Sequence, residues 1–454
     1  MAIVLYLLVF LGITINLSVP ASLSNKSNYA LLIEGLFVCV ISKVIIEFFL
    51  KNCNSKDKNE AQHFFLFSLF LSLVLLNLFW TPYLLPSSEK WGFDPQRYYH
   101  YAIEFNKYGY YDGWVGSGFN GIVFFYAFIF NIVGYHPLIP LYLNMLLVLL
   151  STLMLYDVFK NTQHLKLRYL LFLLFIPELL YYNMMPAKDN LCQFGMVFIF
   201  YGFYKFQSEK KLLHFVFFVF SIALEMLIRF PYALACLLAI GGYILFFSKR
   251  VGRSSKYLLL ILLVVVSVWG IRFVTSLSSV DGLQEDFAGR IGSTMTGGVE
   301  EMEGGSAIAA MLTPHSMIEV FVFGVIRSFL YLFPEGSVSL EWRALGALSQ
   351  PITGIIAAIF IGVFFSFVSK SFREKDNKNM LLLLFFLSIF FLIGFSTPNF
   401  IHQRYRISYD MFYFLILILA YCRYGKKKII YITKRWLVYL TCLSLLYIIL
   451  RLTR

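Results

Sequence analysis

Two polar stretches between long apolar runs carry carboxylates that could act in acid–base chemistry. One stretch reads KWGFDPQRYYHYAIEFNKYGYYDGW, and in it Asp94 directly precedes Pro95. The other reads MMPAKDN and contains Lys188 and Asp189. A positioned carboxylate can take a proton from a reacting hydroxyl group, so Asp94 and Asp189 are candidate general bases. The alternative for Asp94 is the N-cap of a short helix that has Pro95 in its first turn. The alternative for the Lys–Asp pair is a solvated turn.

Cationic side chains could complete such a site by binding a phosphate group. The stretch HQRYRIS places His402, Arg404 and Arg406 in a short loop. Two guanidinium groups suit phosphate or pyrophosphate because each offers a planar fork of N–H donors. Arg229 lies in the stretch EMLIRFP, four residues after Glu225, so these two side chains can pair on one helix face. A structural ion pair and a substrate site are both open for Arg229.

The elements that position these residues are predicted to be membrane-spanning helices. The chain has 454 residues, of which 59% are hydrophobic and 14% are charged, whereas soluble domains are about one-quarter charged. Apolar runs of about 20 residues recur along the chain, and this is the length that crosses a bilayer as a helix. The sequence therefore predicts an all-α, polytopic membrane helix bundle with about thirteen transmembrane helices. The predicted spans are residues 2–19, 30–50, 64–85, 137–158, 169–184, 191–206, 213–228, 231–247, 257–275, 352–368, 380–396, 409–422 and 436–452.

The net charge of +13 comes largely from basic residues gathered in short connecting segments, which lie at residues 51–58, 160–168, 210–211, 249–256, 370–378 and 423–435. The positive-inside rule places such segments on the cytoplasmic side, so their charge gives no reason to expect a nucleic-acid partner. Two large external loops follow from this orientation, at residues 86–136 and 276–351. Each contains an apolar run that is short and interrupted by a polar residue, at 121–134 and 318–333, and we expect both runs as interfacial helices.

The predicted organisation has four parts. Residues 1–63 form an N-terminal pair of transmembrane helices, and residues 64–275 form a core bundle that includes the first external loop. Residues 276–351 form the second external loop, and residues 352–454 form the C-terminal transmembrane helices. The six cysteines show no CxxC spacing, and the chain contains no P-loop, HExxH or GxSxG motif. We therefore expect no disulfide and no site of a soluble-enzyme type.

The order of the polar motifs resembles that of the C-type membrane glycosyltransferases, including the polymerase-like proteins of bacterial surface-polysaccharide clusters. The resemblance covers most of the chain from residue 64 onward, and its motifs are Asp94 before Tyr98 and Tyr99, the run ending at Gly134, Lys188–Asp189, Arg229–Phe230–Pro231 and Arg404–Tyr405–Arg406. It implies sugar transfer from a polyprenyl-linked donor to a saccharide or lipid-linked acceptor. The reaction would take place among membrane lipids, at the external face of a bacterial plasma membrane.

The resemblance also implies roles for single residues. Asp94 matches the family's acidic residue, which acts as a base or a metal ligand. Asp189 is the second candidate for the base. Metal-dependent members have paired acids at this point, but Pro95 follows Asp94 here, so a divalent metal is only weakly implied and no cofactor is expected with certainty. The loop that contains Asp94 also follows the third predicted span, whereas in the family it usually follows the first. The residues expected to bind the donor are Lys188, Arg229, His402, Arg404 and Arg406.

Two functions remain open at this stage. A glycosyltransferase could be a repeat-unit polymerase for O-antigen or capsule, or a transferase of single sugars, because both need a base and a phosphate clamp. The alternative is a flippase or transporter of lipid-linked oligosaccharides. A transporter would have charged groups through the depth of the bundle, whereas the notable charges of this sequence are predicted at the external face.

Overall fold

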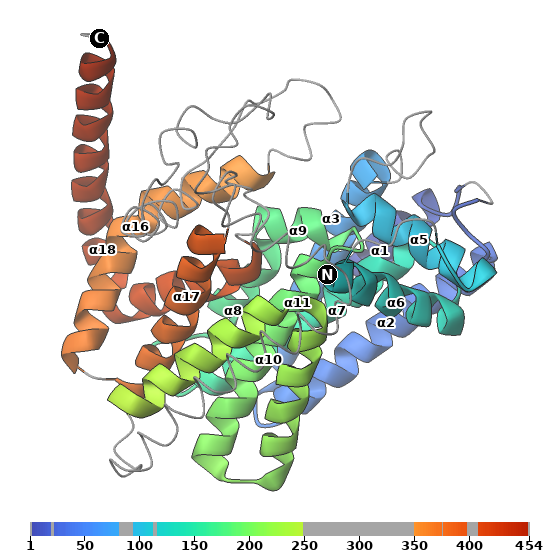
Figure 1. Cartoon of the computed structure of the whole chain (residues 1–454), viewed down its shortest axis with the longest axis horizontal. Helices are drawn as coiled ribbons and strands as arrows, with labels where there is room; N and C mark the ends of the chain where they lie inside the picture. The colour runs from blue at the N-terminus through green and yellow to red at the C-terminus, as the bar shows by residue number, and fades with distance from the viewer. Residues whose placement is uncertain are drawn as a thin grey trace.

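The computed structural model describes residues 2–19, 22–80, 94–111, 116–247, 349–374, 376–396 and 407–452, and within these ranges every regular element is a helix (Figure 1). The elements are α1 (Ala2–Ile15), α2 (Asn28–Phe49), α3 (Ser55–Leu75), the π-helical turn η1 (Leu76–Trp80), α5 (Asp94–Tyr108), α6 (Gly116–Val133), α7 (Leu138–Phe159), α8 (Leu167–Leu171), the 3₁₀ turn η2 (Phe172–Phe175), α9 (Pro177–Asn183), α10 (Lys188–Glu209), α11 (Leu212–Phe246), α16 (Ser349–Glu374), α17 (Asn377–Ser396) and α18 (Ile407–Leu452).

Six of the described helices are long and apolar enough to cross a membrane. They lie at Asn28–Phe49, Ser55–Phe79, Leu138–Phe159, Leu212–Arg229, Ile352–Glu374 and Ile407–Tyr439. Shorter apolar helices lie at Ala2–Ile15, Gly121–Val133, Pro231–Phe246 and Asn377–Ile393. The described chain is therefore an all-α bundle with helices of membrane-spanning length, and the number of about thirteen spans stays a prediction. The span predicted at 257–275 and the interfacial helix predicted at 318–333 lie outside the described residues.

Backbone chemistry explains two of the differences between the predicted and observed helices. The predicted span 169–184 is broken into α8, η2 and α9, and Pro177 is the first residue of α9. Proline lacks an N–H group and disfavours the α conformation in the residue before it, and Ile176 accordingly has φ −58° and ψ 120°. The basic segment 423–435 was predicted as a connection, but most of it is helical. The chain breaks only at Gly425, which adopts φ 72° and ψ 163°.

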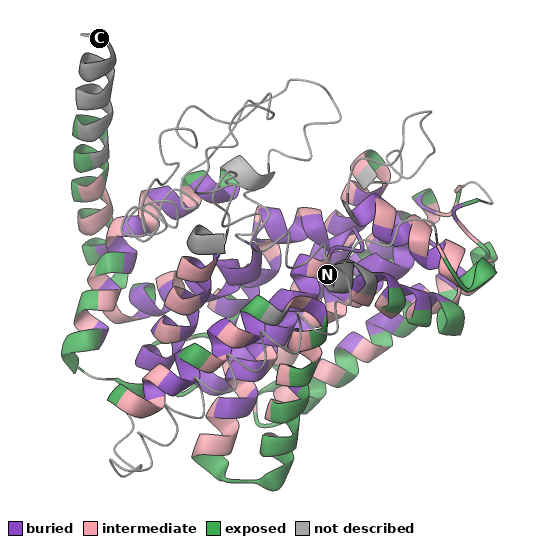
Figure 2. Ribbon diagram, in the orientation of Figure 1, coloured by how far each residue is buried: buried purple, intermediate pink, exposed green. Residues whose placement is uncertain are grey.

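The core of the bundle is built around α7. This helix is the most buried of the six candidate spans, with 78% of its most apolar stretch inside the protein. It packs against α2, α3 and α10. In Figure 1, α1, α2, α5 and α6 lie to one side of the molecule and α16, α17 and α18 to the other. Figure 2 shows buried residues running through the body of the bundle, from one group to the other.

Helices α10 and α11 form a close antiparallel hairpin that is set by two glycines of α10. A Cβ atom on Gly195 would collide with Oε2 of Glu225, and a Cβ atom on Gly202 would lie 3.0 Å from the backbone Cα of Phe218. The two glycines are seven residues apart on α10, and their neighbours are seven residues apart on α11. Both contacts therefore lie on a single helix face. Small residues allow membrane helices to approach this closely.

Several basic segments meet at one end of the bundle. Lys51, Lys160 and Lys205 line one cavity there. The ammonium of Lys378 donates to the backbone oxygen of Val158 at 3.4 Å, next to Lys160 in the chain. We call this the basic end, defined by these four lysines. Lys205 lies in the last turns of α10, so the N-terminus of that helix is about 25 Å away, at the opposite end.

Candidate functional site at the start of helix α10

The turn before α10 is fixed by buried amide groups. The side-chain amide of Asn144 on α7 donates to the backbone oxygens of Asn183 (3.1 Å) and Met185 (2.7 Å). The amide of Asn190 on α10 donates to the oxygen of Tyr182 (3.0 Å) and to Oδ1 of Asn183 (3.1 Å). All three asparagines are buried. Because a buried hydrogen-bonded network defines one arrangement of its members, the turn holds the first residues of α10 in place.

Asp189 and Arg229 are predicted site residues that are in direct contact in the described part of the chain. Nη1 of Arg229 donates to Oδ1 of Asp189 at 2.8 Å, and the two side chains are only 18% and 5% exposed. Asp189 lies in the first turn of α10, where a negative charge is favoured by the helix dipole. Lys188 precedes it as the first residue of the helix. The sequence alone predicted Asp189 and Arg229 as site residues, but it did not predict the ion pair between them.

The backbone at Arg229 is what makes this contact possible. Arg229 has φ −156° and ψ 83°, which interrupts α11. Pro231 follows two residues later and has no N–H group for the carbonyl of Leu227, four residues before it. Gly121 of α6 lies against that carbonyl, since a Cβ atom at this position would come within 2.9 Å of its oxygen. The kink therefore turns Arg229 towards α10 and brings α6 close to the same point.

The aromatic ring of Tyr232 extends the site towards α18. The Arg229 guanidinium lies 4.4 Å from the centre of the Tyr232 ring, a cation–π contact. The hydroxyl of Ser408 donates to the Tyr232 hydroxyl at 3.2 Å. Ser408 is the second residue of α18 and is the last residue of the motif HQRYRIS. Sequence reasoning had not singled out Tyr232, although its position three residues after Arg229 was a signal for a contact on one helix turn.

Glu225 does not form the hydrogen-bonded pair with Arg229 that the sequence suggested. The side chain is fully buried against Gly195, and its side-chain hydrogen bond is with Cys192 of α10 instead of with Arg229. The prediction assumed a regular helix, in which residues four apart share a face. The backbone break at Arg229 removes that geometry.

The segment that begins at Asp94 forms a helical hairpin. Asp94 is the first residue of α5, and its side chain lies outside the described residues. The amide of Asn106 on α5 donates to the backbone oxygen of Ala127 on α6 at 2.9 Å. Through Gly121, α6 then contacts the kink of α11. The hairpin and the Asp189–Arg229 pair are thus joined by one helix contact.

The tyrosines that follow Asp94 pack inside the protein. Tyr98 and Tyr99 are buried, with 1% and 0% of their surface exposed. The hydroxyl of Tyr99 donates to the backbone oxygen of Leu23 at 2.7 Å. Because a buried hydroxyl group needs a hydrogen-bond partner, this contact makes the burial of Tyr99 possible. The two tyrosines therefore attach α5 to the bundle.

The remaining predicted site residues are placed as follows. His402, Arg404 and Arg406 lie outside the described residues. Within the described ranges, no group of three or more His, Cys, Asp or Glu side chains could hold a metal ion. Comparisons of the chain with protein-family models, with characterised proteins and with solved structures return no match.

Proposed function

We propose that this protein is a membrane glycosyltransferase that takes a saccharide from a polyprenyl-phosphate or polyprenyl-pyrophosphate donor at the external membrane face, in the assembly of a bacterial surface polysaccharide. The observation that carries the proposal is the buried Asp189–Arg229 pair at the end of α10 remote from the basic end. It lies beside the contact between α6 and α11, and Tyr232 connects it to the start of α18. Either a repeat-unit polymerase or a single-sugar transferase is compatible with this arrangement.

In the proposed reaction, the acceptor hydroxyl forms a bond to the anomeric carbon of the donor sugar while the bond from that carbon to the phosphate oxygen breaks. The proton of the hydroxyl passes to Asp94 as general base, and the polyprenyl phosphate leaves with the bonding electrons. Arg229 stabilises the negative charge of the departing phosphate, together with Lys188, His402, Arg404 and Arg406. Because one oxygen of Asp189 is bound by Arg229, we assign Asp189 to holding that guanidinium in position.

The test uses purified protein in liposomes that contain a polyprenyl-pyrophosphate-linked saccharide and its acceptor, and it measures release of polyprenyl pyrophosphate. We expect Asp94→Asn to lower the rate by about 10²- to 10⁴-fold, the usual effect of losing a general base. Arg229→Ala should slow release and weaken donor binding. Asp57→Asn is the matched control, because Asp57 lies in the first turn of α3, in the same basic segment of the chain as Lys51. Full activity of Asp94→Asn would remove Asp94 as the base.

A second function, transport of a lipid-linked oligosaccharide, is favoured by one observation. Glu178, Glu225 and Asp410 are all completely buried, on α9, α11 and α18. Ionisable groups inside a membrane bundle are rare and often line a substrate or proton path. The same liposomes separate the two functions. A protein that moves the intact donor between leaflets, without releasing polyprenyl pyrophosphate, would be a transporter.

A further inference from the structure

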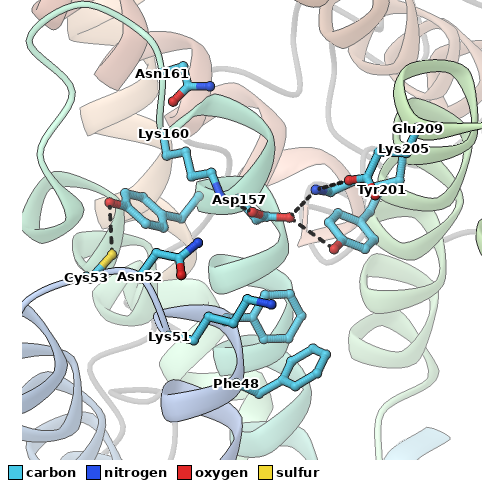
Figure 3. Close-up of a pocket in the computed structure, with 12 residues that line it drawn as sticks. Phe48, Lys51, Asn52, Cys53, Asp157, Lys160, Asn161, Tyr201, Lys205 and Glu209 are labelled. Carbon is cyan, nitrogen blue, oxygen red and sulfur yellow. Dashed lines mark hydrogen bonds and ion pairs between the residues drawn. The ribbon is translucent and has the colours of Figure 1, made fainter.

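A cavity of about 490 Å³ lies at the basic end, far from the Asp189–Arg229 pair. It is bounded by the end of α2 and the turn after it, by the end of α7, and by the end of α10. Figure 3 shows the side chains of Lys51 and Asn52 reaching towards Asp157 and Lys160 from the opposite wall. No residue that lines this cavity takes part in the proposed sugar transfer.

The ion pairs in this cavity leave an excess of positive charge. Asp157 binds Lys160 at 2.7 Å through Oδ1 and Lys205 at 2.7 Å through Oδ2. Glu209 binds Lys205 at 2.9 Å. The lining therefore has three ammonium groups against two carboxylates. Both carboxylates are already engaged by the lysines of α7 and α10, so the third ammonium, on Lys51, is the surplus charge.

The charge of Lys51 is not balanced by any contact inside the cavity. Its ammonium makes no ion pair or hydrogen bond with any residue of the described ranges, although it lines the cavity. The side-chain amides of Asn52 and Asn161 line the same cavity. An ammonium and two amides around one space can bind the oxygens of a phosphate group, since both kinds of group donate hydrogen bonds.

The surroundings of the cavity suit a lipid better than a free ion. Phe48 lines the cavity and is 73% exposed. It ends an exposed apolar stripe on α2 that contains Ile33, Phe37, Val40 and Val44. These residues recur at intervals of three and four, so they lie on one face of the helix. A polar cavity at the end of an apolar helix face matches the two parts of a phospholipid.

We propose that this cavity binds the phosphate of an anionic phospholipid headgroup, with Lys51 as the principal charge and with the acyl chains along the exposed face of α2. Basic pockets between membrane helices on the cytoplasmic side are known to hold anionic headgroups. The inference goes beyond the sugar-transfer reaction and does not depend on it, because the cavity lies at the other end of α10.

The test measures how fast a maleimide modifies Cys53, which lines the cavity, in delipidated full-length protein that carries Cys442→Ser to remove the exposed cysteine. We expect phosphatidylglycerol to slow the reaction and phosphatidylcholine to have little effect. Lys51→Ala should raise the apparent dissociation constant for phosphatidylglycerol about fivefold, which corresponds to about 1 kcal/mol. The matched control is Lys56→Ala, since Lys56 is exposed in the same basic segment but does not line the cavity.

Each outcome of this test decides the proposal. Protection by phosphatidylglycerol that is weakened in Lys51→Ala and unchanged in Lys56→Ala supports it. Equal protection in wild type and Lys51→Ala overturns it, as does the absence of any protection. Inorganic phosphate is the third arm: if it protects Cys53 as well as phosphatidylglycerol does at the same concentration, the ligand is a free anion and the lipid is excluded.

Discussion

The contact between Arg229 and Asp189 gives both residues a structural role that neither shows in the sequence alone. Taken separately, each was a charge near the end of an apolar run. Together they form a buried ion pair between two helices, with Tyr232 against the guanidinium. Burying two charges is costly, and their attraction offsets that cost only when the geometry is good. A pair of this kind is therefore expected to be sensitive to the loss of either partner.

We expect Arg229→Ala to lower the free energy of unfolding by about 3 kcal/mol, because it leaves the Asp189 carboxylate buried without this partner. The measurement is unfolding of the purified protein in detergent, followed by fluorescence. Lys58→Ala is the control, since Lys58 pairs with Glu47 at 2.6 Å where the carboxylate is half exposed, and such pairs contribute about 0–1 kcal/mol. Equal losses in the two variants would show that the Asp189–Arg229 pair has no special stability.

His136 gives a pH dependence that can be assigned to one side chain. It lies just before α7, is 1% exposed, and its Nδ1 accepts a hydrogen bond from the backbone N–H of Leu138 at 3.1 Å. Burial, together with the nearby Lys26 ammonium, lowers the pKa of His136 to about 3. The folded protein therefore keeps this imidazole neutral, whereas the unfolded chain protonates it below its ordinary pKa of about 6.5.

The sign of the effect follows from proton binding. Between about pH 6.5 and pH 3 the unfolded state binds one more proton at His136, so the contribution of this residue to stability falls as the pH falls, by up to about 1.4 kcal/mol per pH unit. His136→Asn keeps an acceptor for the Leu138 N–H but does not titrate. We expect the variant to lose less stability than wild type between pH 6.5 and pH 4.5 in denaturant unfolding. Identical slopes would contradict the prediction.

At the scale of elements, α10 and α11 show how a membrane hairpin is held together. Gly195 and Gly202 let the two helices approach, and the kink at Arg229 ends the straight part of the contact. The asparagine network fixes the turn at the far end of α10. The site is therefore supported by one rigid pair of helices and by α7, and not by a loop. Sequence reasoning located both helices but did not predict which glycines join them.

We expect Gly202→Ala to reduce the free energy of unfolding by about 1–3 kcal/mol, the usual cost of overpacking a close contact. The added Cβ would lie 3.0 Å from the backbone of Phe218, which can give way only if α11 moves. Gly242→Ala on α11 is the matched control. No atom lies within 4 Å of its Cβ position, so the better helix propensity of alanine should leave stability unchanged or raise it by up to about 1 kcal/mol. The stability of both variants is measured by thermal unfolding in detergent. Equal effects of the two substitutions would contradict a close helix contact at Gly202.

At the scale of the whole molecule, the contacts place the chain connections at two ends. The turn before α2 contacts the segment just before α7, since the backbone N–H of Asn25 donates to the backbone oxygen of Tyr135 at 3.2 Å. Lys107 at the end of α5 lies 5.4 Å from the ring of Tyr135, so the end of α5 belongs to the same region. The turn after α2 instead contributes to the cavity of the basic end. A membrane protein with this arrangement has these two groups on opposite sides.

A labelling experiment tests this arrangement in intact cells. Single cysteines replace Tyr29, Tyr110 or Lys56 in a Cys53→Ser, Cys442→Ser background, because the four other cysteines are buried. All three positions are exposed. A maleimide that cannot cross the membrane should modify Tyr29→Cys and Tyr110→Cys, and should reach Lys56→Cys only after permeabilisation. Labelling of the cysteines at 29 and 110 from different sides would contradict the fold, and the fully reversed pattern would contradict the orientation.

The sequence by itself determined the helical, membrane-type architecture, because a run of about 20 apolar residues satisfies its own backbone hydrogen bonds and needs no partner to be recognised. It also located Asp189, Lys188 and Arg229, as charges that interrupt or border such runs. The partners were decided only by the tertiary structure. Arg229 meets Asp189 on another helix because Pro231 breaks α11 and the glycines of α10 bring the helices together. The burial of Tyr99 and the cavity around Lys51 likewise depend on which helix ends meet, and the periodicity of one segment does not contain that information.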